Sequence, residues 1–330
     1  MAALVFIMVM VGGATRLTGS GLSITEWQPV SGAIPPLGDA AWQEAFAKYQ
    51  ASPQYEILNK GMAIGEFKFL FWWEWGHRQL GRFIGLFYLV GLIYAIATRR
   101  VGAAAGIALF GLGLLLGLQG AVGWIMVASG LKPGMSAVEP VKLALHLTLA
   151  SLFFSGVVWA AVRLSERRIA ALSGVVVAQG MALVVLILIQ IALGGLVAGS
   201  HAGLTYNTWP LMDGEFVPAA DVLFSIKPWF ENFVDNPILV QFDHRMTAYA
   251  ALALALWHML SLRGFGTSAA RRARVMVGLI LAQAALGITT LLLVVPLWAA
   301  LAHQAFAILV LGMAVAHAAA MTRDAGVQAS

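Results

Sequence analysis

The stretch AAAGIALFGLGLLLGLQGAVGWIMVA (103–128) contains no charged residue and is long enough to cross a lipid bilayer, which takes about 20 apolar residues. Similar apolar stretches occur along the rest of the chain, near 2–18, 68–97, 138–163, 172–199, 238–262, 272–294 and 297–320. The sequence therefore predicts an all-α integral membrane protein with eight transmembrane helices.

The composition supports this class. The chain has 330 residues, of which 60% are hydrophobic and 11% are charged, whereas a soluble protein carries roughly 25% charged residues. It has no cysteine, which excludes disulfides, thiolate metal sites and cysteine nucleophiles. The first residues, MAALVFIMVMVGG, lack the basic stretch of a signal peptide and are expected to form the first span. The net charge of +5 is not taken to indicate nucleic-acid binding.

Arginines indicate the orientation. They gather in the short connections on one side and in the tail: Arg99, Arg100, Arg163, Arg167, Arg168, Arg263, Arg271, Arg272, Arg274 and Arg323. The positive-inside rule then places both termini in the cytoplasm. The long connections near 20–66 and 200–237 would face outward. Within the first, Asp39–Gln50 is expected to form either an amphipathic helix at the interface or a solvated helix over the bundle.

The two halves of the chain resemble each other. The matching residues, in the same order in both halves, are Gly12 and Gly194, Trp27 and Trp209, His77-Arg78 and His244-Arg245, Gln119 and Gln283, Gly123 and Gly287, and His146 and His303. This order predicts two pseudo-symmetric four-helix bundles, over residues 1–165 and 166–330. Such bundles build cofactor sites from side chains on facing helices.

Histidines within apolar spans are costly and usually mark function. His77 and His146 lie near the outer starts of their spans, as do His244 and His303 in the second half. Each pair can approach one iron from opposite sides, which predicts two bis-histidine heme sites. Hydrogen bonding between helices is the alternative, but it does not explain the repeat. Zinc would lack further ligands.

Two long motifs are specific. The stretches GGATRLTGSGLSITEWQPVSGAIPPL (12–37) and EFKFLFWWEWGHRQLGR (66–82) resemble the signatures of the heme A synthase family, and the resemblance continues through QFDHRMTAY (241–249) to the last histidines. The missing cysteine pair of the first outer loop is typical of the cysteine-free, mitochondrial and proteobacterial branch. The resemblance implies a multi-pass protein of the bacterial inner membrane.

The family resemblance also implies an activity, the oxidation of the C8 methyl of heme O through a hydroxylated intermediate to the formyl group of heme A, for cytochrome oxidase. It further implies that His77 and His146 hold the substrate heme, whereas His244 and His303 hold an electron-passing heme b. Heme O synthase and an unidentified electron-transfer protein are the expected partners, and a homo-oligomer remains open.

Glu74 is the expected catalytic residue. It lies one helical turn before His77 and therefore on the same helix face, where it would stabilise positive charge or accept a proton from water. A salt bridge to Arg78 is the alternative. The second half has Gln241 in the matching position, which favours chemistry in the first half.

Arginines are expected to bind the heme propionates, since a guanidinium matches a carboxylate. Arg78 and Arg245 are the main candidates for this role. Arg16 and Arg82 are weaker ones, for which anchoring of helix ends or outer loops is the simpler interpretation.

Three histidines fall outside the two pairs. His201 is expected in a loop, and His258 and His317 are expected to snorkel or to cap helices near the inner surface rather than to bind a further heme.

Two other functional classes remain open. The first is a diheme membrane cytochrome that passes electrons to or from quinone, because it would need the same four histidines. The second is a transporter, which broken spans and a midplane site would favour.

Overall fold

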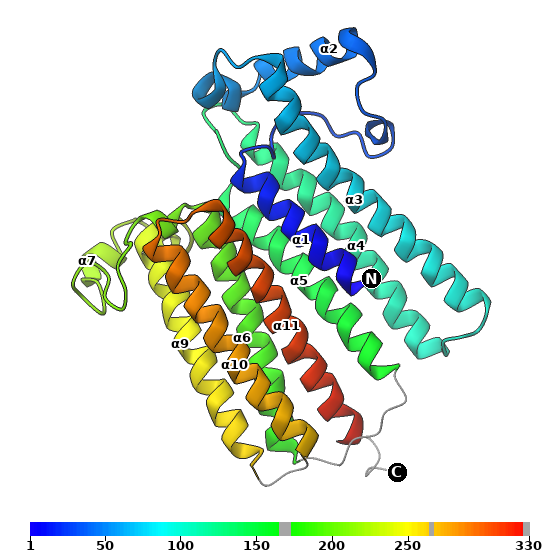
Figure 1. Cartoon of the computed structure of the whole chain (residues 1–330), viewed down its shortest axis with the longest axis vertical. Helices are drawn as coiled ribbons and strands as arrows, with labels where there is room; N and C mark the ends of the chain where they lie inside the picture. Colours follow the sequence, from blue (N-terminus) through cyan, green and yellow to red (C-terminus); the bar gives the residue numbers. More distant parts are fainter. Residues whose placement is uncertain (165–172, 264–266, 326–330) are drawn as a thin grey trace. The chain divides into compact units, whose positions relative to one another are not determined.

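The computed structural model describes residues 1–164, 173–263 and 267–325, and every regular element in these ranges is helical (Figure 1). The predicted all-α class is therefore confirmed. The long helices are α1 (Ala2–Leu17), α3 (Ile64–Ala97), α4 (Ala103–Gly130), α5 (Pro140–Arg163), α6 (Gly174–Gly199), α9 (Pro237–Ser261), α10 (Thr267–Leu292) and α11 (Leu297–Ala325). The short ones are α2 (Gly38–Gln50), α7 (Ala220–Leu223) and α8 (Asn232–Asp235).

Six helices of the described chain are long and apolar enough to cross a membrane, namely α3, α4, α5, α6, α10 and α11. The protein is therefore a multi-pass membrane protein. α1 is apolar but shorter, and α9 carries Gln241, His244, Arg245 and His258 within its length. The eight predicted spans thus coincide with eight long helices. That α1 and α9 each cross the membrane stays a prediction.

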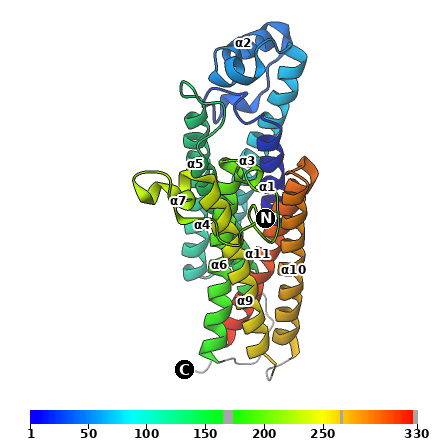
Figure 2. The ribbon, with the colours of Figure 1, turned by 90° about the vertical axis from the view of Figure 1, so that its left-hand side faces the viewer.

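The helices fall into two compact units, Ala3–Ala150 and Ser151–Ser330. In the second unit α6 packs against α9 and α11, and α10 packs against the same two helices (Figure 2). Small residues such as Ala251, Ala255 and Ala314 are fully buried here, which allows close approach of the helices. The four helices therefore close into a ring around a shared core.

In the first unit α3 packs along α4, and α2 covers the start of α3. Trp42, Phe46 and Tyr49 of α2 are buried against Phe67 and Phe71 of α3. The helix expected at residues 39–50 is confirmed, and it buries its apolar side against the protein.

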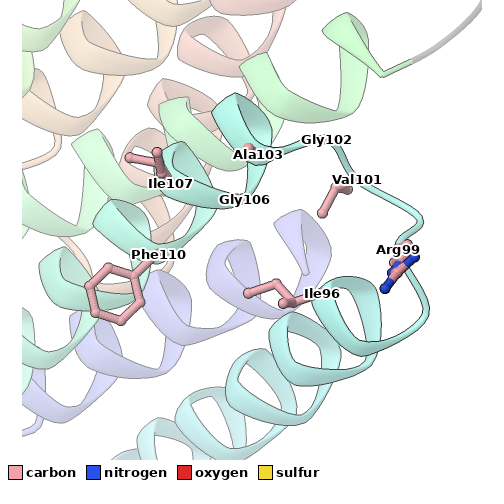
Figure 3. Close-up of a pocket in the computed structure, with 8 residues that line it drawn as sticks. All are labelled: Ile96, Arg99, Val101, Gly102, Ala103, Gly106, Ile107 and Phe110. Atoms are coloured by element: carbon pink, nitrogen blue, oxygen red, sulfur yellow. The ribbon is translucent and has the colours of Figure 1, made fainter.

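A shallow pocket lies at the turn between α3 and α4, beside Ile96, Arg99, Ile107 and Phe110 (Figure 3). Its lining is almost wholly apolar and includes none of the histidines. Arg167 and Arg168, used above for the orientation, lie outside the described residues.

Candidate functional site

His77 on α3 and His146 on α5 form the pair of the first unit. A Cβ atom added to Gly12 of α1 would lie 3.0 Å from Nε2 of His77, and one added to Gly123 of α4 would lie 2.8 Å from Cε1 of His146. Each ring therefore rests directly on the backbone of a neighbouring helix.

The second unit repeats this arrangement. His244 on α9 and His303 on α11 have ring centroids 6.5 Å apart and ring planes inclined by 77°. A Cβ on Gly194 of α6 would lie 3.2 Å from Cε1 of His244, and one on Gly287 of α10 would lie 2.8 Å from Cε1 of His303. Glycine is thus required at the ring contacts because a side chain would displace the imidazole.

Three of the four histidines also contact a glutamine. The pairs are Gln119 with His146, Gln190 with His244, and Gln283 with His303. In each pair Nε2 of the glutamine donates to the backbone carbonyl oxygen of the histidine at 3.0 Å. The same Nε2 lies within 3.3 Å of a nitrogen of the histidine ring. The Oε1 atoms of all three glutamines are buried without a hydrogen-bond partner. Sequence reasoning matched two of these glutamines as repeat partners but gave them no role, and it did not find Gln190.

Glu74 is 2% exposed, and both of its oxygens are occupied. Oε1 accepts from Nη2 and Nε of Arg78, at 2.6 and 3.1 Å. Oε2 accepts from Oγ of Ser23 and the backbone N–H of Ile24, both at 2.8 Å. The salt bridge considered above is therefore present, and it ties α3 to the first outer loop.

The arginines contact backbone carbonyls of the outer loops. Arg78 also donates to the carbonyl oxygens of Ile24 and Glu26, at 2.8 and 3.0 Å. Arg82 donates to those of Gln28 and Pro29, at 2.8 and 2.9 Å. For Arg82 the structure shows the loop-anchoring role that was the simpler expectation, whereas Arg16 lies half-buried at the end of α1.

The second unit has a similar set of contacts. Arg245 donates to the carbonyl oxygen of Tyr206 at 3.1 Å and to that of Leu211 at 3.4 Å. Gln241, in the position of Glu74, donates from Nε2 to the same Tyr206 oxygen at 3.1 Å. The second unit therefore holds its loop with an amide and a cation, and no carboxylate takes part in this contact.

His258 and His317 correct a prediction. Both are fully buried, and their Nε2 atoms are 2.8 Å apart. They neither snorkel nor cap a helix end by solvent contact, because they hydrogen-bond to each other inside the second unit. His201 lies just after α6 with a left-handed backbone, φ 56°, in the loop where it was expected.

The donor sets can be tested against a metal. No group of three or more His, Cys, Asp or Glu residues able to hold an ion is found in the described part of the chain, which disfavours a protein-only zinc site. An imidazole nitrogen lies about 2 Å from a bound metal, so two rings on one metal have centroids roughly 6 Å apart. The 6.5 Å between the His244 and His303 rings fits a metal that needs only two axial protein ligands, as heme iron does.

Known proteins with similar sequences indicate the family of the chain. Residues 1–315 match the family model of the cytochrome oxidase assembly proteins, COX15-CtaA. Heme A synthase of Methylobacterium sp. (strain 4-46) is 63% identical over 96% of this chain and 89% of its own length. That of Methylobacterium radiotolerans is 62% identical over 96% and 87%, and that of Mesorhizobium japonicum is 52% identical over 94% and 86%. The chain therefore belongs to the heme A synthase (COX15-CtaA) family.

Proposed function

We propose that the protein is a heme A synthase, an oxidoreductase that converts the C8 methyl of heme O, through a hydroxylated intermediate, to the formyl group of heme A for cytochrome oxidase. The carrying observation is the repeated pair of half-buried histidines, each set against a glycine, in a chain of this family. The proposal extends to a bacterial inner membrane with both termini in the cytoplasm, which the arginine distribution supports.

In this proposal His77 and His146 hold the iron of the substrate heme, and His244 and His303 hold heme b. When bound, heme b supplies a one-electron redox centre. The assignment is supported by Glu74, which lies beside His77 in the first unit, where the second unit has Gln241 beside His244. A buried carboxylate is the one charged group that distinguishes the two sites at this position.

The contacts of Glu74 favour one of its two expected roles. Four donors occupy its oxygens, so accepting a proton would require one of these bonds to break. Stabilisation of positive charge at the ring edge requires no such change. Glu74 is therefore proposed to act as a fixed negative charge, held in place by Arg78 and the loop residues Ser23 and Ile24.

Arg245 and Arg78 differ as propionate partners. Arg245 makes two hydrogen bonds in the described structure, which leaves three of its five N–H groups for a carboxylate. Arg78 makes four and retains one. We therefore assign propionate binding mainly to Arg245, with Arg78, Arg82 and Arg16 as lesser contributors. Heme O synthase and an electron-transfer protein are the proposed partners.

The test is to extract and chromatograph the hemes from protein purified from cells that make heme O, with wild type and Glu74→Ala compared. Wild type should contain heme b with heme A or the hydroxylated intermediate, and the variant should accumulate heme O. Glu139→Ala, which removes a partly exposed carboxylate paired with Lys132 and Lys142 before α5, is the control and should behave as wild type. Heme b alone in two equivalents in every sample would overturn the synthase assignment and favour a diheme electron carrier.

A further inference from the structure

The four histidines are not equivalent, because His77 lacks a glutamine. The repeat that matches Gly12 with Gly194 places Met8 opposite Gln190. Cε of Met8 would lie 3.3 Å from a Cβ on Gly81, one helical turn after His77. The first unit thus has a methionine at the sequence position where the second unit has Gln190, and the methyl group of this methionine lies close to α3 one turn after His77.

The His77 ring is also turned differently. Its Nε2 is the atom nearest to Gly12, at 3.0 Å from a built Cβ. The rings of His146, His244 and His303 instead present Cε1 to their glycines, at 2.8, 3.2 and 2.8 Å. Only His77 therefore directs Nε2 at the backbone of the neighbouring helix, which makes this nitrogen the least available for a ligand in the orientation shown.

The glutamines suit a defined task at the other three positions. Groups outside the ligand set of a metal site normally fix the orientation of a ligating imidazole. Each glutamine donates from Nε2 to the histidine carbonyl oxygen at 3.0 Å, and the same nitrogen lies within 3.3 Å of a ring nitrogen. The glutamines can thereby hold each imidazole in one orientation relative to its helix.

We infer that His77 would be the more readily released heme ligand of the first site, and that Gln119, Gln190 and Gln283 are positioning residues that fix the other three imidazoles. This inference rests on the proposed function. A substrate heme has to enter and its product has to leave, which a site with one loosely held ligand allows. The heme of the second unit, with a glutamine behind each histidine, would stay in place.

The experiment measures transfer of heme from the purified protein to an excess of apomyoglobin. Met8→Gln should slow the loss of heme O and heme A by roughly tenfold or more, the usual scale for a partner that supports a metal ligand, and should leave the loss of heme b unchanged. Met10→Gln is the matched control, because residues two apart do not share a helix face. Equal rates in Met8→Gln, Met10→Gln and wild type would overturn the inference.

A second set of variants tests the inference without enzyme activity as the measurement and without a substitution at residue 8. Gln190→Met removes the amide that contacts both the ring and the carbonyl oxygen of His244, so it should speed the loss of heme b and change its reduction potential. Gln119→Met should speed the loss of heme O. A potential that is the same in all variants would overturn the positioning role.

The two proposals fail in different ways. Wild-type protein that never contains heme O, heme A or the hydroxylated intermediate would refute the proposed function. Wild-type protein that contains them but releases them at the Met8→Gln rate would refute this inference alone.

Discussion

Nε2 of His258 and Nε2 of His317 lie 2.8 Å apart, and the bonds on either side fix the direction of this hydrogen bond. Nε of Arg272 donates to Nδ1 of His317 at 3.2 Å, so His317 carries its proton on Nε2 and donates to His258. Nδ1 of His258 then donates to Oε1 of Gln179 at 3.2 Å. Two neutral imidazoles thus link α6, α9, α10 and α11.

The first prediction concerns this chain of bonds. His317→Leu leaves the Nε–H of Arg272 and His258 without their partner and should lower the free energy of unfolding by about 1–3 kcal/mol, measured by thermal unfolding in detergent. His258→Leu/His317→Leu should cost less than the sum of the single variants, because both remove the same bond. Loss of a heme from His317→Leu would show instead that the pair binds a cofactor.

The second prediction tests the glycines against the rings. A Cβ at residue 287 would lie 2.8 Å from Cε1 of His303, so Gly287→Ala should reduce the heme b content measured by pyridine hemochrome spectra. Gly123→Ala should reduce heme O and heme A instead, because its Cβ would meet His146. Gly278→Ala and Gly120→Ala are the controls, since nothing lies within 4 Å of a Cβ there; a similar loss in these variants would contradict the ring contact as the cause.

The third prediction concerns the ion pair of the first unit. Arg78→Leu leaves the buried carboxylate of Glu74 without its cation and should destabilise the protein by about 3–5 kcal/mol. Glu74→Leu/Arg78→Leu should recover much of this loss, because no buried charge remains. Thermal unfolding measures the stability of the two variants. An equal loss of stability in both would mean that the lost loop contacts of Arg78 matter more than the unpaired charge of Glu74.

The fourth prediction uses the asymmetry between the units. Gln241→Glu places a carboxylate four residues before Arg245, where the first unit has its Glu74–Arg78 pair. The added negative charge near His244 should lower the reduction potential of heme b, because it stabilises the oxidised, more positive iron. Redox titration of the purified protein measures it, and Gln241→Asn, which shortens a neutral side chain at the same position, separates this charge effect from packing. An unchanged potential would place the carboxylate away from the heme.

Helix positions could be predicted closely from the sequence because uncharged apolar runs define them. The predicted span at 103–128 became Ala103–Gly130 and that at 172–199 became Gly174–Gly199. The histidine pairs could be predicted for the same reason, since a polar residue in such a run stands out. The glutamine contacts could not, because they depend on the rotation of one helix against the next. Gln190 in particular has Met8 as its counterpart, so a comparison of the two halves does not identify it as a shared residue.

His258 and His317 show a second limit. Their spacing along the chain indicated residues near a surface, yet both have no exposed area. A polar side chain can be buried when another one satisfies it, and this partner lies on a different helix, 59 residues away. Sequence periodicity describes one helix at a time and does not reveal such a pairing.

The polarity of α9 has a consequence for how the chain enters the membrane. Gln241, His244, Arg245 and His258 lie within one helix, and each polar residue opposes insertion of an isolated segment into lipid. In the folded unit α6 and α10 pack on either side of α9 and shield these groups from the acyl chains. We therefore expect α9 to be inserted together with a neighbouring helix rather than alone, which makes biogenesis of the second unit a concerted step.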